Sequence, residues 1–188
     1  PHHHSSAASD VYKRQSLHTY KFNEDLFKKI TVVPDGKNHG LVFVLDWSGS
    51  MNSVMMDTLK QLYNLIWFCR KVQIPYEVYA FTIDYPNYDK ERVVEVKDRE
   101  ITIPDNFHLL NFFTHKTKSK DLDRQMLNIF RCAACFDWNM STPWIEVPVG
   151  YRLSGTPLNE TMVALRQILP EFKKNNNVEK VQCVVLTD

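Results

Sequence analysis

The sequence predicts an α/β fold with a mostly parallel central sheet, because short apolar runs alternate with segments of helical periodicity. Residues 41–45 are five consecutive apolar residues, which is typical of a strand covered on both faces. Residues 54–72 carry apolar residues three and four positions apart, which predicts an amphipathic helix. The expected buried face of this helix consists of Met55, Leu59, Leu62, Tyr63, Ile66 and Trp67.

The rest of the chain continues the alternation of strands and helices. A helix is expected to begin at Pro157, since a missing N–H costs nothing in the first turn. The same helix is expected to end near Leu169, because Pro170 disfavours its continuation. The other predicted elements are strands at 76–82, 107–113 and 181–186, a short strand at 92–96, a helix at 121–138 and a loop at 140–152.

The domain organisation follows from the same pattern. Residues 1–15 have no apolar periodicity and are expected to be a non-native leader. Residues 16–37 form an N-terminal extension in which Phe22, Leu26, Phe27 and Ile30 suit a short helix. Residues 38–188 form the domain, which we expect to be truncated at its C-terminus because strand 181–186 should lead into further structure.

Composition excludes several classes of function. The 188 residues are 44% hydrophobic and 24% charged, with a formal net charge of +1, so no global field favours nucleic acid or an anionic membrane. No apolar run approaches the roughly 18 residues that span a bilayer. Four cysteines do not make a disulfide scaffold in a chain of this length, and no secretory signal is visible, so the expected location is the cytoplasm.

Polar side chains gather where predicted strands end and helices begin. Residues 46–50 read DWSGS directly after the first strand, residues 154–158 read SGTPL before a helix, and the last strand ends in Thr187 and Asp188. Ligands of such sheets bind beyond the carboxyl ends of the strands. Hydroxyl and carboxylate oxygens suit Mg²⁺, with Mn²⁺ or Ca²⁺ as alternatives, and Gly49 is expected to relieve crowding in the turn. The candidate metal ligands are Asp46, Ser48, Ser50, Thr156 and Asp188.

These motifs resemble a known family. DWSGS is similar to the D-x-S-x-S signature of the metal-ion-dependent adhesion site in von Willebrand factor A (VWA) domains, and the later GTPL and LTD resemble the other two segments of that site. The resemblance implies a three-layer, Rossmann-like fold. It also implies that Ser48, Ser50 and Thr156 ligate the metal directly, that Asp46 and Asp188 hold it largely through water, and that an acidic partner side chain takes the remaining position.

Within VWA proteins, the chain looks most like the VWA subunit of aerobic cobaltochelatase and its phage-encoded relatives. This resemblance implies a non-ATPase partner of an AAA+ ATPase, in a cobaltochelatase-like complex of cobalamin biosynthesis or a MoxR-like complex, and the host cytoplasm for a phage-encoded protein. Those proteins usually carry a long acidic segment before the VWA domain, and none is present in this sequence. A role in cobalt insertion is therefore left open.

Several alternatives stand beside this interpretation. Ser48 and Ser50 would also suit simple capping of the following helix. A metal-dependent hydrolase or peptidase, or a direct chelatase component, is the competing class of function. The sequence has no P-loop, no HExxH helix and no GxSxG turn, so catalysis by the chain alone is not expected. Cys132 and Cys135 have the spacing of a redox or zinc pair, but their helical, apolar context predicts inert thiols.

Overall fold

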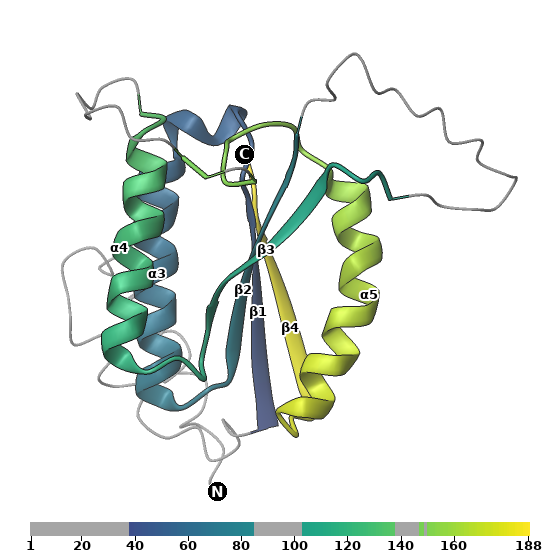
Figure 1. Ribbon diagram of the computed structural model, residues 1–188. Coiled ribbons are helices and arrows are strands. Elements are labelled where there is room, and N and C mark those ends of the chain that lie inside the picture. Colours follow the sequence, from purple (N-terminus) through teal and green to yellow (C-terminus); the bar gives the residue numbers. More distant parts are fainter. Residues whose placement is uncertain (1–37, 85–102, 138–146, 149) are drawn as a thin grey trace, which may run out of the picture. The chain divides into compact units, whose positions relative to one another are not determined.

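The computed structural model describes residues 38–84, 103–137, 147–148 and 150–188, which fold around a four-stranded sheet (Figure 1). The strand order is β3-β2-β1-β4, with β1 in parallel with both β2 and β4. The predicted α/β fold with a mostly parallel sheet is confirmed. The exception is β3, which was predicted only as a further core strand and lies at one edge, antiparallel to β2. The strands are β1 (His39–Asp46), β2 (Tyr76–Ile83), β3 (Phe107–Thr114) and β4 (Lys180–Leu186).

Helices cover both faces of the sheet, so the described part of the domain has three layers. Figure 1 shows α3 (Met55–Val72) and α4 (Ser119–Ala134) on one face and α5 (Leu158–Asn175) on the other. A short 3-10 helix, η3 (Ser50–Ser53), leads from the turn after β1 into α3. All described residues belong to one compact unit, Lys37–Asp188. Within the described ranges, no helix is long and apolar enough to cross a membrane.

The central strand β1 is buried on both faces, as its apolar run predicted. Phe43 and Leu45 pack into the cluster beneath α3 and α4, whereas Val42 and Val44 pack into the cluster beneath α5. Side chains alternate between the faces of a strand, so each apolar residue of the run has a hydrophobic layer to enter. The strand that delivers Asp46 to the edge of the sheet is therefore rigidly held.

Two predictions about helices are wrong. Trp67 was expected on the buried face of α3, but its side chain is 46% exposed, and Cys69 takes the buried position in the last turn. Helix α5 does not end near Leu169 but continues through Pro170 to Asn175. Pro170 lies on the exposed side of the helix, and burial of Phe172 one half-turn later anchors the final turn against the sheet. That packing outweighs the backbone hydrogen bond that proline removes.

Other predictions lie outside the described residues. These are the leader at 1–15, the extension at 16–37, the short strand at 92–96 and most of the loop at 140–152.

Candidate functional site

The first candidate ligand, Asp46, is the last residue of β1 and is fully buried. Its Oδ2 accepts a hydrogen bond of 2.7 Å from the Thr187 hydroxyl, which comes from the end of the neighbouring strand β4. Its Oδ1 is also buried and has no hydrogen-bond partner among the described residues. A buried carboxylate oxygen without a partner is costly, so this atom marks a place where a positively charged or proton-donating group is needed.

Two serines and a second carboxylate continue the site. Ser48 is buried, and its Oγ lies 3.1 Å from the Oγ of Ser50. The Ser50 hydroxyl in turn donates to Oδ1 of Asp188 over 3.1 Å. The segments at 46–50 and 187–188 are thus joined side chain to side chain at the carboxyl ends of β1 and β4, where the C-terminus lies in Figure 1.

Residues 151–156, which we call the threonine loop, reach the same edge of the sheet. Beyond the last β1–β2 pair, Ser48 pairs with Ser154 in parallel, while Ile83 pairs with Gly155 in antiparallel. The loop therefore inserts between the diverging ends of β1 and β2. The backbone hydrogen bonds are 2.8 Å from the Gly49 amide to the Ser154 carbonyl and 3.1 Å from the Gly155 amide to the Ile83 carbonyl. Thr156 follows directly, with an exposed side chain, and precedes α5.

The two glycines of the site have different roles. Gly49 was expected to relieve crowding, and this is wrong: its φ is −64°, and an added Cβ would lie 3.8 Å from the nearest atom, the Ser154 carbonyl oxygen. Gly155 is the residue that close packing requires, because a Cβ there would lie 2.7 Å from Cγ2 of Ile83. The glycine of the GTPL segment therefore permits the loop to insert beside β2.

The described part of the site suits a hard divalent cation. It combines two carboxylates with neutral hydroxyls, all oxygen donors of the kind that Mg²⁺ prefers. The buried Oδ1 of Asp46 has no hydrogen-bond partner among the described residues, and a cation is one group that would satisfy it. Within the described ranges, no group of three or more His, Cys, Asp or Glu side chains is placed to hold a metal ion.

The simple capping interpretation of the serines does not hold. The N-cap residues of η3 and α3 are Gly49 and Val54, so neither serine holds that position. The Ser48 and Ser50 hydroxyls contact each other, and Ser50 donates to Asp188. Capping would have required a serine oxygen to accept from a backbone amide of the helix.

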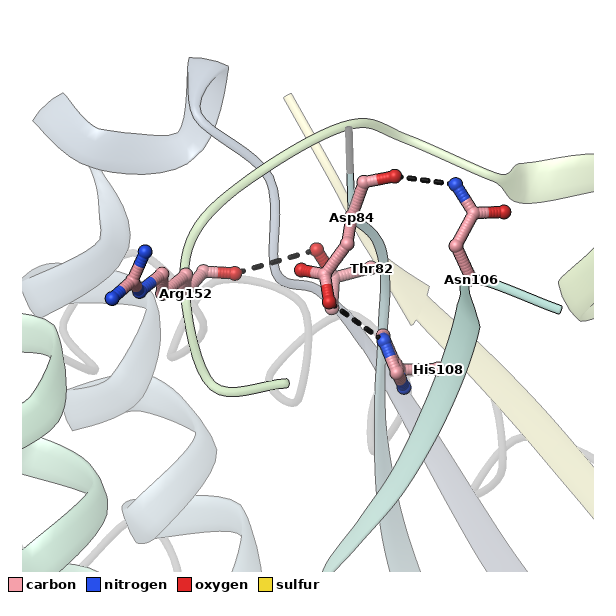
Figure 2. Close-up of polar contacts among 5 residues, drawn as sticks. All are labelled: Thr82, Asp84, Asn106, His108 and Arg152. Carbon is pink, nitrogen blue, oxygen red and sulfur yellow. Dashed lines mark hydrogen bonds and ion pairs between the residues drawn. The ribbon is translucent and has the colours of Figure 1, made fainter. Parts of the chain in front are cut away.

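A separate polar cluster lies across the threonine loop from Ser48 (Figure 2). Nε2 of His108 is 2.9 Å from Oδ2 of Asp84, and the side-chain amide of Asn106 donates to the backbone carbonyl of Asp84. The cluster ties the start of β3 to the end of β2. Ser154 and Gly155 lie between the ends of β1 and β2, so this histidine is separated from Ser48 by the inserted loop. In Figure 2 the Arg152 guanidinium points away from the pair, while its carbonyl accepts from Thr82 at 3.5 Å.

The sequence analysis placed Trp47 and Thr187 within the motifs but gave neither a role, and both organise the site. The Thr187 hydroxyl holds Asp46, and the buried indole of Trp47 donates to the Tyr151 carbonyl over 2.8 Å. A signal for the second was present, because a buried tryptophan usually finds a partner for its N–H. The cysteine prediction concerned Cys132 and Cys135, which are both free and half-buried at the end of α4.

Comparison with known proteins adds no relative. No family model, no curated protein and no solved structure matches this chain. The chemical interpretation of the site therefore rests on the side chains themselves and on the motifs they form.

Proposed function

We propose that the chain is a VWA-type protein-binding domain that holds a divalent cation, Mg²⁺ in the first instance, at the edge of its sheet. The observation that carries the proposal is the buried, unpartnered Oδ1 of Asp46 beside a connected set of hydroxyls and a second carboxylate. A cation at this point would satisfy the buried charge that the described protein groups leave uncompensated.

Each residue has a specific part in this proposal. Ser48, Ser50 and Thr156 offer hydroxyl oxygens, and Asp46 and Asp188 offer negative charge. Thr187 holds Oδ2 of Asp46, and Oδ1 has no partner among the described residues, so Oδ1 would be available to a cation. When bound, the cation supplies Lewis acidity, because neutral hydroxyls leave its charge only partly compensated. An Asp or Glu side chain of a partner protein is then the group that the site is suited to accept.

The partner class rests on the resemblance alone. The motifs DWSGS, GTPL and LTD are most similar to VWA subunits that accompany AAA+ ATPases. We therefore propose an AAA+ motor as the partner, in a cobaltochelatase-like or MoxR-like complex in the cytoplasm. In the chelatase version, movement of the motor would pass through this contact to a subunit that holds the tetrapyrrole.

The enzyme alternative has one supporting observation, the carboxylate-paired histidine formed by Asp84 and His108. A general base must lie within hydrogen-bond reach of the group that it deprotonates. The inserted loop separates this pair from Ser48, which favours binding over hydrolysis.

The test begins with metal binding by the isolated protein. Mn²⁺ binding followed by electron paramagnetic resonance, with Mg²⁺ as competitor, should be saturable for the wild type. Ser48→Ala and Thr156→Ala should each weaken it by about tenfold, the equivalent of about 1.4 kcal/mol. Ser53→Ala is the matched control, since Ser53 is an exposed serine of η3 whose side chain makes no hydrogen bond to the described part of the chain. It should bind as the wild type does.

The second stage is a pull-down with an AAA+ ATPase from the same organism. Capture should require Mg²⁺, be lost in EDTA and be lost with Ser48→Ala. Capture that ignores both the metal and the substitution would refute the adhesion-site proposal. Turnover of a peptide or ester by the isolated protein would instead support the enzyme alternative.

A further inference from the structure

Trp47, the second residue of the DWSGS segment, is fully buried although it lies between two candidate ligands. Its backbone amide donates to the Phe81 carbonyl at 2.9 Å, which is the last hydrogen bond between β1 and β2 before they diverge. Its indole Nε1 donates to the Tyr151 carbonyl at 2.8 Å. One residue therefore contacts both the end of the sheet and the first residue of the threonine loop.

A second connection between Trp47 and the loop runs through an aromatic cluster. The Trp47 ring meets the Phe112 ring edge-on, with centroids 5.1 Å apart and an interplanar angle of 89°. Phe112 in turn stacks on Tyr151, at 6.0 Å and 8°. Such aromatic contacts add to the energy of simple burial and fix ring orientation. Tyr151 is thus held by its carbonyl and by its ring.

Beyond Tyr151, the threonine loop is held by packing of Leu153 against the core cluster beneath α3 and α4 and by a hydrogen bond from the Thr82 hydroxyl to the Arg152 carbonyl. Backbone hydrogen bonds hold Ser154 and Gly155, whereas no contact of the Thr156 hydroxyl is recorded among the described residues. The place of Thr156 is then set by how firmly residues 151–155 are held. A metal ligand must be held within about half an ångström of its binding position by the residues around it, so a small displacement of Thr156 would weaken metal binding.

We propose that Trp47 is a positioning residue, which holds the threonine loop so that Thr156 is set for the cation. The proposal rests on the proposed function as a cation site and adds a residue that is not itself a ligand. This positioning role requires a tryptophan at residue 47. Phenylalanine retains an aromatic ring beside Phe112 but has no N–H for the Tyr151 carbonyl.

The experiment compares Trp47→Phe with Trp67→Phe. The control makes the same chemical change at an α3 tryptophan that is 46% exposed. Mn²⁺ affinity should fall about three- to tenfold for Trp47→Phe, the range expected from losing one net hydrogen bond, and should not change for Trp67→Phe. In a Thr156→Ala background, Trp47→Phe should cost little further affinity, because its effect passes through Thr156. A lowered melting temperature with unchanged affinity would mean that Trp47 is only structural, and would overturn the proposal.

Hydrogen exchange of the metal-free protein separates this inference from the proposed function. Trp47→Phe should speed exchange of the Gly155 amide, which is bonded to Ile83, while Trp67→Phe should not. If the wild type binds no Mn²⁺, the cation site fails, and with it the claim that Trp47 serves a cation. Unchanged Gly155 exchange in Trp47→Phe would overturn the anchoring claim whatever the metal result. If Trp47→Phe does not fold, Phe112→Leu removes the aromatic connection alone and should give a smaller change in the same two measurements.

Discussion

Asp46→Asn should make the metal-free protein more stable while removing its response to Mg²⁺. In the wild type, Oδ1 of Asp46 is buried without a partner, and no ion pair among the described residues neutralises the carboxylate. Asparagine has nearly the same shape and can still accept the Thr187 hydrogen bond. The substitution therefore exchanges a buried charge for a buried neutral amide, which is cheaper to desolvate.

The expected magnitudes are large enough to measure. Asparagine leaves a neutral amide group buried in the same place, so the gain is the excess cost of burying a charged group, on the order of 1–3 kcal/mol. Each kcal/mol shifts the melting temperature of a domain of this size by about 2–4 °C. In EDTA, Asp46→Asn should melt higher than the wild type by about 2–12 °C. A ligand at a hundred times its dissociation constant stabilises by about 2.7 kcal/mol. Mg²⁺ should thus raise the wild-type melting temperature by about 5–10 °C and leave the variant unchanged.

Differential scanning fluorimetry in EDTA and in a Mg²⁺ series measures both effects. Asp57→Asn is the control, because Asp57 is an exposed residue of α3 whose one ion pair within the described ranges is with Lys60. It should change neither the EDTA value nor the Mg²⁺ response. If Asp46→Asn melts below the wild type in EDTA and still gains stability from Mg²⁺, Oδ1 of Asp46 is not where a cation acts.

Two further predictions concern the fold. Gly40→Ala should lower the free energy of unfolding by about 1–3 kcal/mol, because the added Cβ would lie 2.5 Å from Cε1 of Phe172. Urea titration measures this change, and an unchanged midpoint would mean that α5 packs less closely on β1. Burial raises the pKa of the Cys69 thiol to about 11, so the folded state keeps its proton while the unfolded thiol ionises near pH 9. The contribution of this thiol to the free energy of unfolding is complete below pH 9 and declines by up to about 2 kcal/mol towards pH 11. Cys69→Ala should reduce this decline, which is measured by comparing urea midpoints at pH 8 and 10.5.

The sequence predicted those elements whose packing follows from local periodicity. The apolar run at 41–45 predicted a strand buried on both faces, and the structure has Val42 and Phe43 in opposite hydrophobic layers. Spacing alone could not locate the exact edge of a helical face. Trp67 lies one position from Ile66, which is buried, and one position is about 100° around a helix.

The features that could not be predicted depend on tertiary contacts between segments far apart in the sequence. Pro170 is a helix breaker by local rules, and only the burial of Phe172 against the sheet explains why α5 continues. The insertion of Ser154 and Gly155 between β1 and β2 depends on where two strands diverge, which no spacing in the sequence encodes. The motifs nominated Asp46, Ser48, Ser50 and Asp188 separately, and side-chain contacts connect Ser48 through Ser50 to Asp188. The supporting roles of Trp47 and Thr187 required the tertiary structure.

The joining of β1 to β4 has a consequence for how the protein matures. The Thr187–Asp46 hydrogen bond spans 141 positions of the chain, and the Ser50–Asp188 bond spans 138. Contacts of such high sequence separation form late, because the entropy of closing a long loop must be met before they stabilise anything. During synthesis, Asp46 therefore leaves the ribosome long before Thr187 is available to hold it, and its carboxylate stays hydrated in the meantime. Desolvation of that carboxylate and docking of β4 against β1 become a single late event, at which a divalent ion in the surrounding solution would first find its ligands together.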